Sequence, residues 1–277
     1  MKRALAVASI VVVLAGCSLR QAMQPKAHAA GPPRVISLAP SLTEIAFAIG
    51  CGDRLVGDTA YDNYPPQAKS LPHVADLAHA DLEGVAQLQP TAILALHDQE
   101  KEGAQIAARI PVQIEYLPNR NLDDLYTDVE GVGAACELRE RARAYERGLR
   151  DAIKRAHCSQ TGGPRVFVLL GLPGFTVGRR SYINDLIDIA GGRNVAASID
   201  QPYPNLGAEA IIKADPDIIV VSKDTPFGAD VQKRQPWASL RAVREHRIIS
   251  PPNDDVIERN GPRLVQGLRW LKSELCR

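Results

Sequence analysis

The chain of 277 residues is long enough for one or two domains with a substantial core. Hydrophobic residues make up 45% of it and charged residues 23%, which is typical of globular proteins and excludes fibrous and disordered chains. The 33 basic and 32 acidic side chains nearly cancel, so there is no excess of positive charge to hold a polyanion, and we expect no nucleic-acid partner.

The amino terminus has the pattern of a bacterial lipoprotein signal peptide. Two basic residues precede an apolar run at residues 4–15, which is shorter than the roughly 20 residues of a transmembrane helix. The run ends in LAGC, which resembles a lipobox, so we predict that residues 1–16 are removed and that Cys17 is lipidated. Residues 17–32 then form a flexible tether to a membrane, in a periplasmic or other extracytoplasmic location. The alternative is a plain secretory peptide cut after residues 27–29.

Export would place the remaining cysteines in a compartment that permits disulfides. Cys51, Cys136, Cys158 and Cys276 allow three connectivities. Chain order favours the pairs Cys51–Cys136 and Cys158–Cys276, because each bridge then stays within one half of the chain. Buried free thiols are the alternative.

An internal repeat divides the chain into two halves. Segments 31–38 and 162–169 each combine a Gly/Pro breaker, one arginine and a continuous apolar run typical of a buried parallel strand. Segments 82–95 and 208–221 each have a glutamate at the start of a short helix, a proline seven residues later and then an apolar strand. Because both matches occur in the same order, the sequence predicts two α/β lobes of similar topology.

Residues 137–157 are predicted to form one long helix between the lobes. Apolar side chains recur there at helical spacing along one stripe, and most of the other residues are charged. Acid–base pairs at i,i+4 spacing support the helix locally. The predicted fold class is therefore α/β, with two Rossmann-like lobes at residues 33–136 and 158–277 that are bridged by one long α-helix.

The sequence has no motif of a catalytic nucleophile, a zinc hydrolase or a phosphate-binding loop. The histidines are scattered, and His73, His79 and His97 are the three that lie in one region. No pair of histidines has the i,i+4 spacing of helical metal ligands. We therefore expect no enzyme, no cofactor and no metal, and a metal-dependent hydrolase that uses these three histidines is the alternative.

Polar and aromatic loops follow the predicted strands. Open α/β sheets bind ligands beyond the carboxyl ends of their strands. The candidate loops are residues 37–41, 60–66, 75–81, 172–176 and 253–263. Such loops would line a cleft between the lobes, whereas the alternative is that they are ordinary packed turns and helix caps.

Four segments together resemble a known family. They are RVISLAPSLTE at 34–44, YDNYPP at 61–66, GGRNV at 191–195 and IERNGPR at 257–263. This combination is similar to the helical-backbone substrate-binding proteins of ABC importers, which handle cobalamin, haem and ferric siderophores, and it most resembles the cobalamin-binding members. The resemblance implies two α/β lobes bridged by one helix, and a monomer that delivers a corrinoid to an ABC permease and ATPase complex. Haem and ferric siderophores are the alternative ligands.

The resemblance also implies roles for single residues. Tyr61 matches a tyrosine that contacts the corrin ring, and residues 255–259 match the ligand loop of the second lobe. The expected ligand-binding residues are Tyr61, Asp255, Val256, Ile257, Glu258, Arg259, His79 and Pro40. Glu83 and Glu209, one in each lobe, match the two carboxylates that dock onto arginines of the permease.

Departures from the family pattern concern the ligand. The cobalamin binders have a tryptophan in the loop that reads 75–81 here, and another aromatic residue where this chain has Val256 or Ile257, so fewer rings would face a corrin. Haem binders tend to place an axial tyrosine near residues 76–77, where this chain has none. His79 and Tyr61 are then the candidates to approach a haem iron.

Overall fold

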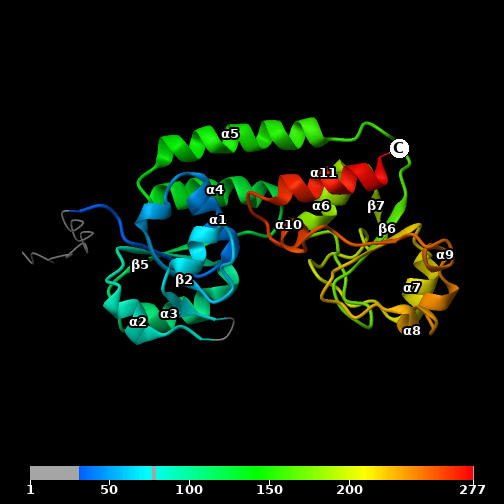
Figure 1. The fold of residues 1–277 in the computed structure, drawn as a ribbon, viewed down its shortest axis with the longest axis horizontal. Helices are drawn as coiled ribbons and strands as arrows, with labels where there is room; N and C mark the ends of the chain where they lie inside the picture. The colour runs from blue at the N-terminus through cyan, green and yellow to red at the C-terminus, as the bar shows by residue number, and fades with distance from the viewer. Residues whose placement is uncertain (1–30, 77–78, 277) are drawn as a thin grey trace, which may run out of the picture. The chain divides into compact units, whose positions relative to one another are not determined.

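The structure is a computed structural model that describes residues 31–76 and 79–276, and Figure 1 shows their course. The predicted signal peptide and the predicted lipidation site at Cys17 lie outside the described residues. Residues 32–277 make up one compact unit. Among the helices of the described residues, none has both the length and the apolar character that a membrane crossing requires.

The amino-terminal half of the chain forms a five-stranded sheet in the order β3-β2-β1-β4-β5, with all neighbours parallel. The strands are β1 (Val35–Ser37), β2 (Leu55–Thr59), β3 (His73–Ala75), β4 (Ala92–Leu96) and β5 (Gln113–Leu117). Its central strands are continuous apolar runs because helices cover both faces, and Val35, Ile36, Ile93 and Leu94 are fully buried.

Two pairs of helices cover the two faces of this sheet (Figure 1). The helices are α1 (Pro40–Ala48), α2 (Leu82–Gln87), α3 (Glu100–Ala107) and α4 (Leu122–Ala135). Side chains of α1 and α4 pack with Val35 and Leu94, whereas Val85 of α2 and Ile106 of α3 pack with Ile36 on the other face. Alternate strand residues thus enter different layers of the core.

The second sheet has four parallel strands in the order β7-β6-β8-β9. The strands are β6 (Arg165–Leu169), β7 (Arg193–Asn194), β8 (Ile218–Val221) and β9 (Ile248–Ile249). The helices are α6 (Tyr182–Ile189), α7 (Ala208–Ala214), α8 (Ala229–Gln232), α9 (Arg241–Arg244), α10 (Asp255–Glu258) and α11 (Leu264–Leu275). Val166 packs with α6 and α11, whereas its neighbour Phe167 packs with Trp237 on the opposite face.

The internal repeat is confirmed by the topology of the two sheets. The first repeated segment is β1 in one lobe and β6 in the other, and the second is α2 with β4 in one lobe and α7 with β8 in the other. In both lobes the two repeated strands are hydrogen-bonded neighbours in the sheet. The predicted fold class, two α/β lobes, is therefore confirmed.

The predicted helix between the lobes is also present as α5 (Arg139–Ala156), slightly shorter than residues 137–157. It packs on α4 of the first lobe and on α11 of the second, so it bridges them. Its crossing with α4 depends on Gly133, because a Cβ atom there would lie 2.3 Å from the Cβ of Ala142. Of the predicted i,i+4 pairs, Glu146 and Arg150 form an ion pair at 2.6 Å.

The cysteine pairing that chain order favours is the one in the structure. Cys51 bonds to Cys136, and Cys158 bonds to Cys276. All four residues are buried. The first bridge ties the turn after α1 to the end of α4, and the second ties the chain after α5 to the end of α11.

Candidate functional site

Exposed aromatic and large apolar side chains gather on loops that follow the strands. Among the described residues, the exposed ones are Tyr61, Tyr64, Leu172, Phe175, Tyr203 and Ile212. The first two follow β2, the next two follow β6, and Tyr203 lies on the connection after β7. Because parallel strands end at the same edge of a sheet, five of these six side chains belong to the face where α/β proteins bind ligands.

The loop after β6 presents Phe175, which is 39% exposed. Its backbone is fixed by short antiparallel bridges from Phe175 to Gly171 and to Asn205. Gly174 allows the close approach, since a Cβ atom there would lie 2.3 Å from the carbonyl oxygen of Leu206. The ring of Phe175 lies 6.1 Å from the ring of Tyr203, so the two form a tilted aromatic pair.

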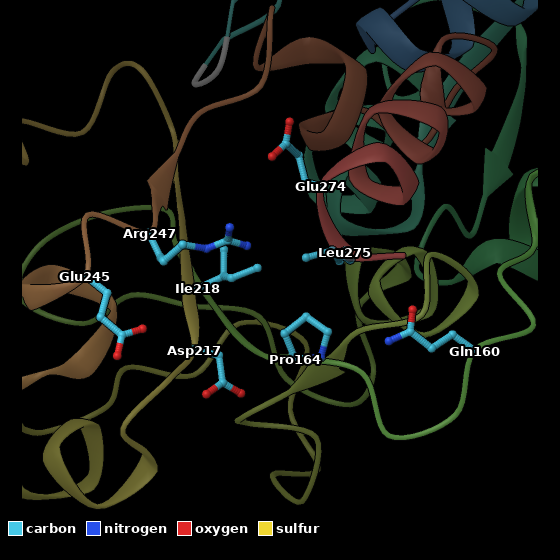
Figure 2. A pocket seen from close by; sticks show the side chains of 8 residues that line it. All are labelled: Gln160, Pro164, Asp217, Ile218, Glu245, Arg247, Glu274 and Leu275. Atoms are coloured by element: carbon cyan, nitrogen blue, oxygen red, sulfur yellow. The ribbon is translucent and has the colours of Figure 1, made fainter. Parts of the chain in front are cut away.

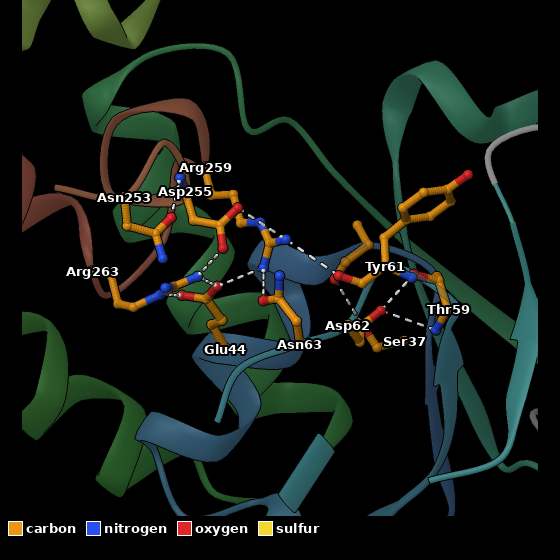
Figure 3. Close-up of polar contacts among 11 residues, drawn as sticks. Ser37, Glu44, Thr59, Tyr61, Asp62, Asn63, Asn253, Asp255, Arg259 and Arg263 are labelled. Atoms are coloured by element: carbon orange, nitrogen blue, oxygen red, sulfur yellow. Dashed lines mark hydrogen bonds and ion pairs between the residues drawn. The ribbon is translucent and has the colours of Figure 1, made fainter. Parts of the chain in front are cut away.

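The loop after β2 holds Tyr61 by polar contacts beneath it. The buried carboxylate of Asp62 accepts hydrogen bonds from the backbone N–H of Thr59 at 2.9 Å and from its hydroxyl at 2.5 Å. The N–H of Tyr61 donates to the same hydroxyl oxygen at 3.2 Å. Figure 3 shows the Tyr61 ring pointing away from these contacts, and 46% of the residue is exposed.

An ionic cluster joins this loop to the other lobe. We call Glu44, Asp255, Arg259 and Arg263 the interlobe cluster (Figure 3). Arg263 binds both oxygens of Glu44, with Nη2 at 2.6 Å from Oε1 and Nε at 2.9 Å from Oε2. Arg259 Nη1 lies 3.1 Å from Oε1 of Glu44, and Asp255 contacts Arg263 at 3.0 Å and Arg259 at 3.1 Å. Burial would lower the pKa of Arg263, but hydrogen bonds and charges from Glu44 and Asp255 outweigh it and raise that pKa.

The predicted ligand loop of the second lobe contains both buried apolar side chains and charged side chains that form ion pairs. Val256 and Ile257 are 4% and 1% exposed and belong to the core that also holds α11. These apolar side chains anchor the short helix α10 in the core, and their contact with a ligand stays a prediction. Asp255 and Arg259 take part in the interlobe cluster, so the charge of Arg259 is already balanced by protein carboxylates.

Three other predicted ligand residues lie at the same loops. Glu258 lies on α10 and is exposed as a whole residue, whereas partial burial of its carboxyl and nearby carboxylates raise the pKa of that group, although a hydrogen bond with Ser222 opposes this. Pro40 is the first residue of α1 and is half-buried. The His79 side chain is 84% exposed, 3.9 Å from Asp76.

The three histidines of the alternative hydrolase do not converge. His73 Nδ1 lies 2.6 Å from Asp58, His97 Nδ1 lies 3.0 Å from Glu100, and His79 is beside Asp76. Within residues 31–76 and 79–276, no group of three or more His, Cys, Asp or Glu side chains is arranged to hold a metal ion. Each histidine therefore has a carboxylate partner of its own.

The two predicted docking glutamates occupy matching places in the lobes. Glu83 lies in the first turn of α2 and Glu209 in the first turn of α7, and both are exposed. The side chain of Asp81 caps α2 by accepting hydrogen bonds from the N–H groups of Glu83 and Gly84, each at 3.1 Å. On α7, Ile212 is one turn from Glu209 and is 44% exposed.

Two cavities within the described residues lie away from the exposed aromatic loops. One of about 270 Å³ is at the amino ends of the second sheet, since Pro164, Asp217 and Arg247 precede β6, β8 and β9. Figure 2 shows the carboxylates of Asp217, Glu245 and Glu274 around it pointing in different directions. Another of about 350 Å³ is lined by the start of α4 and by residues along α6, from Asn184 to Ile189. Neither is formed by the exposed aromatic loops.

Tyr203 and Glu44 are among the residues of this site that were not predicted as ligand-binding residues. Tyr203 lies between Pro202 and Pro204, and this aromatic residue within a proline-rich connection was the available signal. Glu44 was part of a recognised motif, but its role depends on partners more than 200 residues away, at separations of 215 and 219. No local pattern could have connected them.

Comparisons with known proteins agree with this arrangement. The family described as periplasmic binding protein matches residues 35–254. The uncharacterized ABC transporter substrate-binding lipoprotein YvrC of Bacillus subtilis (strain 168) is 28% identical over 88% of this chain and 80% of its own length. The vitamin B12-binding protein of Yersinia pestis (strain Pestoides F) is 32% identical over 88% of this chain and 86% of its own length.

A solved structure shares the architecture. The periplasmic heme-binding protein RhuT from Roseiflexus sp. RS-1, in apo form, superposes with a TM-score of 0.75 at 28% identity, over 88% of this chain and 98% of that one. The two parallel-sheet lobes, the bridging helix and these matches lead to one assignment. The chain belongs to the periplasmic binding protein family and is a class III substrate-binding protein.

Proposed function

We propose that the chain captures cobalamin or a related corrinoid on the loops between its lobes and delivers it to an ABC permease with its ATPase. The observation that carries this proposal is the set of exposed rings that both lobes present beyond their strands. Tyr61 and Tyr64 belong to the first lobe, and Phe175 and Tyr203 belong to the second. The vitamin B12-binding relatives support the choice of ligand.

A corrinoid suits such a surface for a physical reason. Its macrocycle is broad and largely apolar on its faces, and its rim carries amides. Rings of Tyr and Phe offer large contact area at low entropic cost, and a Tyr hydroxyl can also bond to an amide. Leu172, 38% exposed beside Phe175, extends the apolar surface of the second lobe.

Delivery would use the matching glutamates of the two lobes. Glu83 and Glu209 are exposed at helix starts, where they remain free to meet cationic side chains. Charges placed in this way guide encounter and register with a partner of complementary charge. Ile212 supplies an apolar contact beside Glu209. A lipid anchor at Cys17 would keep the protein at the membrane that holds the permease.

Haem is the second candidate ligand. The exposed phenol of Tyr61 and the exposed imidazole of His79 are groups that could bind an iron from the same loops. The heme-binding protein RhuT has the same fold, which supports keeping this alternative.

Calorimetric and spectroscopic titration of residues 32–277 tests the proposal. One-to-one binding of cyanocobalamin with a Kd near 1 μM or tighter, about −8 kcal/mol, is the expected result. A shifted Soret band with hemin and no heat with cyanocobalamin would replace the corrinoid by haem. Binding of neither would refute both ligands.

A further inference from the structure

Glu44 is a buried carboxylate at the centre of contacts that reach the ligand-facing loops. It lies on α1, and its side chain is 1% exposed, so it is covered from any ligand. A buried charge is costly unless it is paired and hydrogen-bonded. Glu44 meets this requirement through Arg263, which binds both of its oxygens, and through Arg259. Both partners belong to the segment that follows β9 in the second lobe.

Arg259 connects Glu44 to the loop after β2, because its guanidinium contacts both. Besides Glu44, its guanidinium donates to Oδ1 of Asn63 at 2.9 Å and to the carbonyl oxygen of Tyr61 at 3.2 Å. Arg263 adds a contact of its own, since its guanidinium carbon lies 4.3 Å from the centre of the Tyr64 ring. Each arginine therefore touches both Glu44 and the loop that carries the exposed tyrosines. Figure 3 shows the contacts of Arg259 with Glu44, Asn63 and Tyr61.

The cluster is balanced in charge. Arg259 and Arg263 face Glu44 and Asp255, which gives two cations and two carboxylates. Removing the charge of Glu44 alone would leave one uncompensated cation among largely buried groups. The bidentate geometry on Glu44 also fixes orientation, which a single ion contact would not.

We infer that Glu44 is a positioning residue for ligand binding: it holds the loop with Tyr61 and the segment 255–263 in one fixed arrangement without touching the ligand. The ligand part of this inference rests on the proposed function. The structural part does not, because it concerns contacts within the protein. It predicts that one substitution on α1 loosens two segments that belong to different lobes.

Hydrogen–deuterium exchange of ligand-free residues 32–277 tests the structural part. Glu44→Gln keeps the side-chain volume and removes the charge. We expect amide exchange in residues 60–64 and in residues 255–263 to rise at least about tenfold, as for the loss of a buried charge-assisted pair. Ile45→Val is the matched control, because Ile45 is the next residue of α1, fully buried in the core and outside the cluster. The control should leave exchange in both segments unchanged relative to the rest of the chain.

A second variant guards against a failure of Glu44→Gln to fold. Arg259→Gln lies at the edge of the cluster and keeps the contacts between Glu44 and Arg263. It should raise exchange in residues 60–64. If that segment exchanges at the wild-type rate in Arg259→Gln and in any folded Glu44→Gln protein, the inference is wrong.

Titration with cyanocobalamin tests the ligand part. We expect Glu44→Gln to weaken binding at least about tenfold and Ile45→Val to leave it within about twofold. Wild-type affinity in a Glu44→Gln protein with raised exchange would overturn the positioning role in binding. If the wild-type chain binds neither cyanocobalamin nor hemin, the proposed function fails, and the exchange data still decide whether Glu44 positions the two segments.

Discussion

Replacing Asp128 by asparagine should stabilise the protein at alkaline pH and have little effect at acidic pH. Asp128 lies on α4 and is 0% exposed. Its Oδ2 accepts a hydrogen bond from Nδ2 of Asn119 at 2.8 Å, whereas its Oδ1 has no hydrogen-bond partner among the described residues. Burial raises the pKa of Asp128 to about 7, because too few hydrogen bonds compensate for the loss of water around the charge.

The sign of the effect follows from proton linkage. The unfolded carboxyl ionises near 3.8, whereas the folded one holds its proton up to about 7. The folded state therefore binds more protons in this range, and the stability contributed by Asp128 is fully present below 3.8 and is lost as pH rises through about 7. At about 1.36 kcal/mol per pKa unit, the difference corresponds to roughly 4 kcal/mol as an upper limit. Asparagine, a neutral side chain of the same shape, does not ionise.

Urea unfolding of wild type and Asp128→Asn between about pH 5 and about pH 8.5 measures this effect. The variant should lose less stability than wild type as pH rises, and a residual decline from Asp58, whose pKa is also raised to about 7 by burial, should remain in both. Asp124→Asn is the contrasting control. Hydrogen bonds from Arg120 outweigh the effect of burial and lower the pKa of Asp124, so its loss should destabilise at neutral pH. Equal pH slopes in wild type and Asp128→Asn would refute the argument.

Other substitutions test the binding face, the docking residues and the core. Tyr61→Ala should raise the Kd for cyanocobalamin about tenfold in calorimetric titration, since an exposed ring is lost, and an unchanged Kd would assign this residue to the turn alone. Glu83→Ala combined with Glu209→Ala should leave that Kd unchanged and impair ligand uptake by cells, and a weakened Kd would contradict a docking role. Leu186→Ala should lower the free energy of unfolding by about 2–5 kcal/mol in urea, because the side chain is fully buried, and a loss well below this would show that the surrounding core collapses into the space.

Features that repeat or alternate along the chain made the fold predictable. The breaker, arginine and apolar run that open each lobe correspond to β1 and β6, and the glutamate–proline pattern corresponds to α2 with β4 and to α7 with β8. The apolar stripe of α5 indicated the bridging helix within two residues at its start. These signals are local, because strand and helix periodicity depend on neighbours in sequence.

The site was less predictable because its geometry depends on distant partners. The sequence placed Tyr61 on a loop after a strand, but it could not separate Val256 and Ile257, which face the core, from the charged residues beside them. In a helix as short as α10, no periodicity distinguishes an inner face from an outer one. Likewise, no residue near Arg259 in the sequence indicated that its guanidinium would pair with Glu44.

The balance of charge in the interlobe cluster bears on which ligands the protein can prefer. Arg259 was the predicted cation of the ligand set, yet its guanidinium already contacts Glu44 and Asp255. A ligand carboxylate would have to displace one of these groups from Arg259, and the loss of that ion pair within a charge-balanced cluster would offset the new contact. Under the proposed function, the exposed rings of Tyr61, Phe175 and Tyr203 would then recognise the ligand, because aromatic rings can pack on the faces of a macrocycle whatever its charge. This favours a ligand rich in neutral amides over a siderophore that relies on anionic oxygens.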